Sequence, residues 1–232
     1  MQRSLAALVI FDVDGTLFEA HRVTVPAVQR SLAAFGLPAP ETNAITAWFG
    51  KPLEEYHAWL ASLCPPDLAA PVIARTDREE LALIASDGRL YPGVPDMLAT
   101  LHAQGHVLGT SSNAPQDYFD EVLDHFNIRR YFAMPLCRGT EFADKRAMVA
   151  AIMARHAPRP AIVVGDRRDD IDSARANHAL AIAATYGFPL ANELDTADAH
   201  VRTAEEIPAV IDTLIAARRV GTVATEHSKL DA

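Results

Sequence analysis

The sequence has few cysteines, few basic side chains and no long apolar run. Its 232 residues include only two cysteines, Cys64 and Cys137. Two thiols cannot build a disulfide framework or a zinc knuckle, and they fit a reducing compartment. A membrane span needs roughly 20 apolar residues, whereas the apolar run at Leu5–Phe11 ends at once in Asp12. That run is also too short for a signal peptide. We therefore expect a cytoplasmic protein with no membrane partner.

Basic side chains are outnumbered by acidic ones. The chain carries 21 Lys and Arg against 30 Asp and Glu, which gives a formal net charge of −9. General nucleic-acid binders carry a basic stripe, so we expect no nucleic-acid partner. A small anionic substrate is still compatible with this charge if a metal ion or a local cation reverses the field at one site.

Apolar residues are plentiful, at 50% of the chain, which is enough for a packed core. The length fits one large domain, or a core of roughly 150 residues with a smaller inserted unit. We expect a monomer or a homodimer.

Apolar runs alternate with helical patterns over much of the chain. Strands are expected at Leu5–Phe11 and at 106–110, 131–136, 161–164 and 179–184. Helices are expected near 94–101, 116–126, 144–156, from about 170, and near 204–217. The first run is apolar throughout, as in a strand buried on both faces. This alternation predicts an α/β protein with a parallel-sheet, Rossmann-like core.

The stretch between residues 18 and 89 shows only helical patterns. Val28, Leu32 and Phe35 recur at helical spacing, a second apolar stripe follows Leu53, and residues 67–86 again read as a helix. We expect an all-helical subdomain at 18–89, inserted into a core formed by 1–17 and 90–218. Residues 219–232 lack periodicity and are expected to form a mobile tail.

Polar residues stand where the predicted strands end. Active sites of open parallel sheets lie at the carboxyl ends of the strands. The residues found there, or at the start of a following helix, are Asp12, Asp14, Thr16, Ser111, Ser112, Asn113, Lys145, Asp166 and Asp170. The sheet is expected to bring them together.

These residue types favour metal-dependent phosphoryl transfer. Carboxylates converging from two strands, Asp12 with Asp166 and Asp170, repel one another unless a cation lies between them. Hard oxygen ligands suit Mg²⁺, which also recruits phosphate. Asp12 can attack phosphorus, and Asp14 is placed to protonate the leaving oxygen and then to activate water.

The same positions match a known family. Asp-Val-Asp-Gly-Thr (12–16), Ser112-Asn113, the isolated Lys145 and Gly-Asp-x-x-x-Asp (165–170) resemble the four motifs of the haloacid dehalogenase superfamily. The helical stretch after the first motif resembles members with a helical cap, and most of all the phosphoglycolate phosphatase-like branch. The similarity spans nearly the whole chain, from Leu5 to about Leu214.

The resemblance implies a Mg²⁺-dependent phosphatase acting on a small phosphorylated metabolite. It implies Asp12 as the nucleophile, Asp14 as the general acid/base, and Mg²⁺ held by the Asp12 side chain, the Asp14 main-chain carbonyl and Asp166, with Asp170 in support. Expected catalytic or substrate contacts also include Thr16, Ser112, Asn113, Lys145 and Lys51.

Some positions stay open at this stage. Arg146 follows Lys145 where many relatives have proline. The second motif could lie at Thr110, Ser111 or Ser112, and we place it at Ser112. Lys51 is either a substrate contact or a plain turn lysine. We expect Asp169 to be a solvated or helix-capping carboxylate, and Trp48, Phe49, Tyr56 and Trp59 to belong to the core of the helical subdomain.

Four other functions are alternatives to this one. The presence of Asp14 disfavours a dehalogenase or a phosphonate hydrolase, whose relatives alter that position. A sugar phosphomutase shares all four motifs. A non-catalytic binding or regulatory protein on the same scaffold is disfavoured by the intact set of ionisable residues, because function resides in the site and not in the fold.

Overall fold

The computed structural model describes residues 6–139, 141–156 and 159–230, with side chains described up to residue 218. Its helices and strands alternate as expected in the second half of the chain. In order they are β1 (Leu8–Phe11), α1 (His21–Ala34), α2 (Thr42–Thr46), α3 (Leu53–Ser62), α4 (Pro66–Ser86), α5 (Val94–Ala103), β2 (Val107–Ser112), α6 (Gln116–His125), β3 (Phe132–Cys137), α7 (Lys145–His156), β4 (Ala161–Gly165), α8 (Arg168–Ala176), β5 (Leu180–Ala184), β6 (Ala199–Val201) and α9 (Ile207–Leu230).

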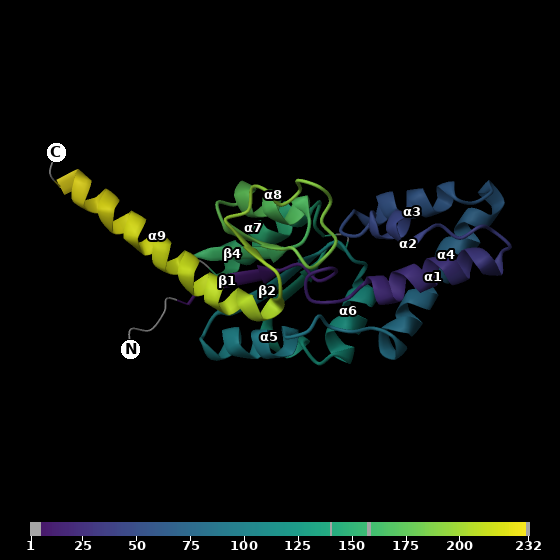
Figure 1. Cartoon of the computed structure of the whole chain (residues 1–232), viewed down its shortest axis with the longest axis horizontal. Helices are drawn as coiled ribbons and strands as arrows, with labels where there is room; N and C mark the ends of the chain where they lie inside the picture. Colours follow the sequence, from purple (N-terminus) through teal and green to yellow (C-terminus); the bar gives the residue numbers. More distant parts are fainter. Residues whose placement is uncertain (1–5, 140, 157–158, 231–232) are drawn as a thin grey trace.

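The strands form one parallel sheet in the order β3-β2-β1-β4-β5-β6. The α/β, Rossmann-like fold predicted from the sequence is confirmed. Alternate residues of β1 enter two separate apolar clusters: Val9 packs with the cluster that includes α5 and α9, and Ile10 with the cluster that includes α7 and α8. Helices therefore cover both faces of the sheet (Figure 1), which explains why β1 is apolar throughout.

Helices α1–α4 form a separate group of helices beside the sheet (Figure 1), which we call the helical insert (residues 21–86). Helix α4 packs along α1 and α3, and their contacts bury Val28, Leu60 and Ile84 completely. The chain enters and leaves the insert side by side, because Phe18 and Leu90 form an isolated β-bridge.

Several element boundaries differ from the predicted ones. Strand β2 continues through Ser112, beyond its predicted end at residue 110. The prediction ended early because the last residues of the strand are buried polar side chains that carry no apolar pattern. Short elements such as α2 and β6 were not predicted, because five and three residues hold too little periodicity to be recognised. Helix α9 runs past residue 217 to Leu230; the mobility expected for 219–232 stays a prediction. No helix in the described part of the chain has the length and hydropathy that crossing a bilayer requires.

The helical insert buries one carboxyl group. The Glu80 side chain on α4 is 8% exposed. It accepts hydrogen bonds from the Tyr56 hydroxyl, at 3.2 Å, and from Thr24. Burial raises the pKa of Glu80 to about 8 from an ordinary value of 4.5, and the charges of Asp77 and Asp14 add to the shift, because both disfavour the ionised form.

This burial makes the stability of the fold depend on pH. Between pH 4.5 and 8 Glu80 is protonated in the folded chain and ionised in the unfolded one, so the free energy of unfolding falls as pH rises through this window. Glu80→Gln removes that loss. We expect the variant to gain at least about 2 kcal/mol relative to the native chain between pH 5 and pH 8.5, measured by urea denaturation.

The neighbouring Glu79→Gln serves as the control, because Glu79 is partly exposed and pairs with Arg75 at 2.9 Å. A stability difference between Glu80→Gln and the native chain that is the same at both pH values would contradict the prediction.

Candidate active site

The turn after β1 presses its backbone against the end of β4. The Asp12 amide donates to the Val164 carbonyl at 2.9 Å, so Asp12 continues the ladder between the two strands. Gly15 then adopts a φ of +85°, and a Cβ there would lie 2.3 Å from Oδ2 of Asp166. Only glycine permits both the conformation and the close approach.

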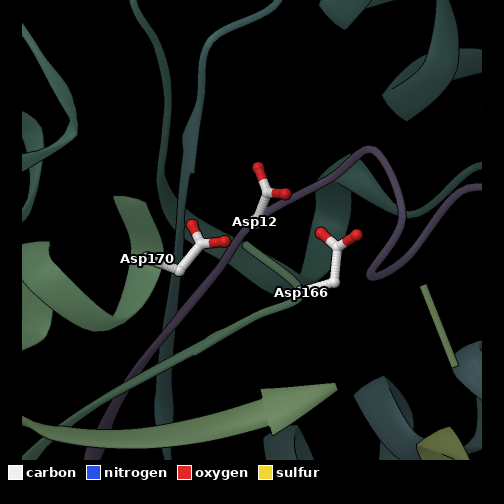
Figure 2. Close-up of side chains that lie close together, drawn as sticks. All are labelled: Asp12, Asp166 and Asp170. Atoms are coloured by element: carbon white, nitrogen blue, oxygen red, sulfur yellow. The ribbon is translucent and has the colours of Figure 1, made fainter. Parts of the chain in front are cut away.

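Three carboxylates meet where β1 and β4 end. Asp12, Asp166 and Asp170 each offer an oxygen within 4.8 Å of the others, and all three are buried. Figure 2 shows them facing a common space. Burial raises the pKa of Asp166, and the charge of Asp12 adds to the shift. Burial likewise raises the pKa of Asp170, to about 7, against the opposing effect of the Lys145 charge. The cluster is therefore short of positive charge.

The oxygens of the cluster are not equally occupied. Both oxygens of Asp170 accept hydrogen bonds, one from Lys145 at 2.7 Å and one from the Arg167 amide at 3.1 Å. Asp166 accepts from the Phe188 amide at 2.7 Å and weakly from Thr16 at 3.4 Å. Oδ2 of Asp12 is buried and has no hydrogen-bond partner among the described residues. A buried carboxylate oxygen without a partner is costly unless a cation or a ligand completes its coordination.

Lys145 is the cation built into this cluster. It is fully buried at the start of α7, and its Nζ lies 2.7 Å from an oxygen of Asp12 and 2.7 Å from one of Asp170. Burial by itself would lower the pKa of Lys145, but the adjacent charges of Asp12 and Asp170 outweigh it and raise that pKa above its usual range. The lysine expected from the sequence thus reaches the site as a charged ammonium.

Asp14 lies apart from this ion pair. The Tyr118 hydroxyl donates to its Oδ1 at 3.0 Å. Burial and then the charge of Asp12 raise the pKa of Asp14 to about 7, while the bond from Tyr118 acts in the opposite direction. Asp14 lines the same cavity as Asp12.

A cavity of about 80 Å³ joins the strand ends to the helical insert. A water needs roughly 10–15 Å³ on this measure, so the cavity holds a small molecule or several waters. Of the residues predicted from the sequence, those lining it are Asp12, Asp14, Lys51, Ser112 and Asn113. Lining residues that the sequence did not single out as site residues include Thr24, Glu80 and Tyr118.

Ser112 lines the cavity and Ser111 does not. The Oγ of Ser112 accepts a hydrogen bond from the Ala114 amide at 3.1 Å. Ser111 is buried outside the cavity lining, with an Oγ that has no partner among the described residues. Thr16 is likewise fully buried and lies against Asp166 instead of lining the cavity. This geometry favours Ser112 as a ligand-facing residue and gives Thr16 a positioning place.

Polar residues outside the helical insert hold the loop between α2 and α3, which we call the Gly50 loop (residues 47–52). Arg167 donates to the Phe49 carbonyl and pairs with Glu193 at 2.9 Å, and Asn113 Nδ2 donates to the Gly50 carbonyl at 2.8 Å. Gly50 has a φ of +74°, and a Cβ there would lie 2.7 Å from Cγ of Arg167. Arg167 and Glu193 were not predicted, because a pairing across 26 residues leaves no sequence pattern.

Asp169 accepts a hydrogen bond from Asn113 at 3.3 Å and does not join the carboxylate cluster. Trp48, Phe49 and Tyr56 pack with the apolar core, as expected, but they also line the cavity. Trp59 stacks on Trp48 with ring centroids 5.5 Å apart.

Comparison with known proteins places this geometry in a family. The model of the haloacid dehalogenase-like hydrolases matches residues 9–184. Phosphoglycolate phosphatase 1 of Pseudomonas aeruginosa is 30% identical over 212 residues, covering 83% of this chain and 75% of its own. Phosphoglycolate phosphatase of Pseudomonas putida is 29% identical over 208 residues, covering 83% and 74%. The tyrosine-protein kinase PtkA of Mycobacterium tuberculosis is 27% identical, covering 86% and 70%.

Solved structures agree on the fold. A haloacid dehalogenase-like protein, SP0104 of Streptococcus pneumoniae, superimposes with a TM-score of 0.78 at 22% identity, covering 89% of this chain and 98% of its own. A Haemophilus somnus protein described as a predicted phosphoglycolate phosphatase gives 0.81 at 21% identity, with the same coverage. The chain belongs to the haloacid dehalogenase-like hydrolases and resembles their phosphoglycolate phosphatase-like branch.

Proposed function

We propose that the chain hydrolyses a small phosphate monoester through an aspartyl-phosphate on Asp12. The observation that carries the proposal is the unpartnered buried Oδ2 of Asp12, at a cavity that also exposes Asp14 and Ser112. The other oxygen of Asp12 is held by Lys145 at 2.7 Å. One oxygen is thus fixed while the other is free to attack, as covalent catalysis requires. The similarity to phosphoglycolate phosphatases supports the same reaction class.

The residues present fit a magnesium ion. The carboxylates of Asp12 and Asp166 are hard oxygen donors that lie within 4.8 Å of each other, in a cluster that lacks positive charge. Asp12, Asp166 and the main-chain carbonyl of Asp14 would hold the ion. Because both Asp170 oxygens are occupied, Asp170 would support the cluster from behind. When bound, Mg²⁺ would offset the repulsion between nucleophile and phosphate.

The proposed reaction has two steps, transfer of the phosphoryl group to Asp12 and its hydrolysis. The Asp12 oxygen forms a bond to phosphorus while the bond from phosphorus to the leaving oxygen breaks, and Asp14 gives that oxygen a proton. Asp14 then takes a proton from water, which attacks the phosphoryl group and releases phosphate from Asp12. Ser112 and Lys145 would hold the non-bridging oxygens, since an ammonium has three donors and Lys145 uses two of them on carboxylates.

The insert would act as a cap over this chemistry. The Gly50 loop is held across the cavity by hydrogen bonds from Arg167 and Asn113, so substrate entry would require these bonds to open. Closing them again excludes water from the reacting groups. The division into a core of 1–17 and 90–218 and a cap of 18–89 is part of this proposal. A sugar phosphomutase would use the same groups at the strand ends, but the curated relatives named as phosphatases favour hydrolysis.

Replacing the nucleophile tests covalent catalysis. Asp12→Asn is expected to lower Mg²⁺-dependent release of p-nitrophenol from p-nitrophenyl phosphate by at least about a thousandfold, because the amide cannot form the acyl phosphate. Circular dichroism should show an intact fold. Asp96→Asn, an exposed change on α5, is the matched control. Retained turnover in Asp12→Asn would refute the mechanism.

Metal binding can be followed without turnover. Saturating Mg²⁺ is expected to raise the melting temperature of the native chain by about 5–10 °C, since an ion at 100 times its dissociation constant adds about 2.7 kcal/mol. Asp166→Asn should lose most of this shift, whereas Asp169→Asn, outside the carboxylate cluster, should keep it. The assignment of the cluster fails if Mg²⁺ shifts neither the native chain nor the control.

Lys51 distinguishes a substrate contact from a turn residue. It is exposed and lines the cavity, so its attraction for a phosphate is partly screened by water and salt. Lys51→Ala is expected to raise KM for anionic esters about three- to tenfold with little change in kcat, and Lys51→Arg should restore KM. Steady-state kinetics in which Lys51→Ala matches the native chain would assign Lys51 to the turn alone.

A further inference from the structure

Three polar residues that line the cavity come from helices of the helical insert. Thr24 comes from α1, Tyr56 from α3 and Glu80 from α4, and all three line the same cavity as Asp12 and Asp14. They are joined to one another, because Tyr56 and Thr24 both donate to the Glu80 carboxyl. The chemistry proposed above gives these three residues no part. They are placed to meet the portion of a substrate that lies beyond the phosphoryl group.

The charges around the cavity limit what that portion can be. Among the lining residues the carboxyl groups are those of Asp12, Asp14 and Glu80, and the only cation is Lys51, which is exposed. The lining contains no arginine or histidine. A carboxylate on the leaving group, as in phosphoglycolate, would enter beside Glu80 without a buried cation to pair with it. A carboxylate that loses its water in such a site without a cation to pair with it binds poorly.

The raised pKa of Glu80 shows that this part of the cavity does not stabilise a negative charge. The Glu80 carboxyl is held mainly neutral, because burial and the charges of Asp77 and Asp14 outweigh the hydrogen bonds from Thr24 and Tyr56. Surroundings that do not stabilise their own carboxylate offer no better stabilisation to a second one from the substrate.

Neutral hydroxyl groups, in contrast, suit all three side chains. A protonated carboxyl, a phenol and a threonine hydroxyl can each donate and accept a hydrogen bond. The adjoining wall is apolar and aromatic, with Trp48, Phe49 and Leu53 in the lining, which fits the carbon skeleton of a polyol. Polar groups at fixed positions against an apolar wall are the usual build of a small-molecule site.

We propose that Thr24, Tyr56 and Glu80 form a subsite for the leaving group and select phosphate esters of neutral, hydroxyl-bearing alcohols over phosphoglycolate. Glu80 is the specificity-determining member, because it is the residue to which the other two are hydrogen-bonded. The inference rests on the proposed phosphatase activity and names its substrate class. The preferred esters are those of glycerol or of a sugar.

The first experiment measures preference in the native chain with Mg²⁺. We expect kcat/KM for glycerol 3-phosphate, or for a hexose or pentose phosphate, to exceed that for 2-phosphoglycolate by at least about tenfold. A native chain that hydrolyses 2-phosphoglycolate as well as or better than each of these esters overturns the inference and leaves the phosphatase proposal standing.

The second experiment assigns the preference to Glu80. Glu80→Leu should lower kcat/KM for the preferred polyol ester by about tenfold or more, because hydrogen bonds to the hydroxyls are lost in a buried site. The loss on p-nitrophenyl phosphate, whose leaving group carries no further hydroxyl, should be at least about fivefold smaller. Glu80→Gln should recover most of the loss, and Glu79→Gln, the adjacent control, should match the native chain. Equal losses on both esters in Glu80→Leu would mean a structural role only and would contradict the proposal.

Binding to Asp12→Asn separates the two proposals. Calorimetry with Mg²⁺ compares glycerol 3-phosphate with 2-phosphoglycolate, and it needs no turnover. We expect about tenfold tighter binding of glycerol 3-phosphate, and a smaller difference when Glu80→Leu is added. If no ester is hydrolysed by the native chain yet this difference is found, the phosphatase proposal fails while the subsite stands. Equal binding of the two esters overturns the subsite.

Discussion

The buried ammonium of Lys145 is the interaction on which the rest of the site depends. It lies within 2.7 Å of both Asp12 and Asp170, and it is the only cation among the described residues that contacts the carboxylate cluster. Without it three carboxyls would be buried together with nothing to oppose their repulsion, and they would take up protons or draw in water. In the proposed reaction it holds one oxygen of Asp12 and leaves the other for attack on phosphorus. The same contact thus serves stability and reactivity.

Backbone geometry brings the charges to that ammonium. Parallel pairing of β1 with β2 and β4 sets Phe11 level with Thr110 and Val164, so the residues that follow each strand emerge at one edge of the sheet. The turn through Gly15 then fits against Asp166, where any side chain would collide with the carboxylate. A second glycine, Gly50, lets the Gly50 loop approach Arg167 in the same way. Both close approaches trade conformational freedom for proximity, and together they enclose the cavity between core and insert.

Much of this arrangement could be predicted from the sequence, and the limit has a physical cause. The apolar run at Leu8–Phe11 and the alternation after it carry periodic signals, so the parallel sheet was predictable; the carboxylates and Lys145 follow from their places at strand ends and at a helix start. Signals of that kind are local. The pairing of Arg167 with Glu193, the bond from Tyr118 to Asp14 and the place of Glu80 arise from packing between elements far apart in the chain, and no spacing encodes them. The predicted strand β2 ended too early for a related reason. The buried end of the strand is polar because it belongs to the candidate site.

The two halves of the cavity therefore differ in charge, and each suits a different part of a substrate. At the strand ends, negative groups are concentrated around a fixed ammonium and leave one carboxylate oxygen unmatched, which suits a divalent cation and a phosphoryl group bound together. On the insert side the single carboxyl is kept neutral by burial, which suits an uncharged leaving group. A phosphate ester has the same division, since its charge is confined to one end. A second charge at the other end would have to be desolvated without a buried partner, and this cost falls on the ester's affinity without helping the bond that breaks. On the proposed subsite, the helices of the insert, more than the strand ends, would thus determine which ester this hydrolase accepts.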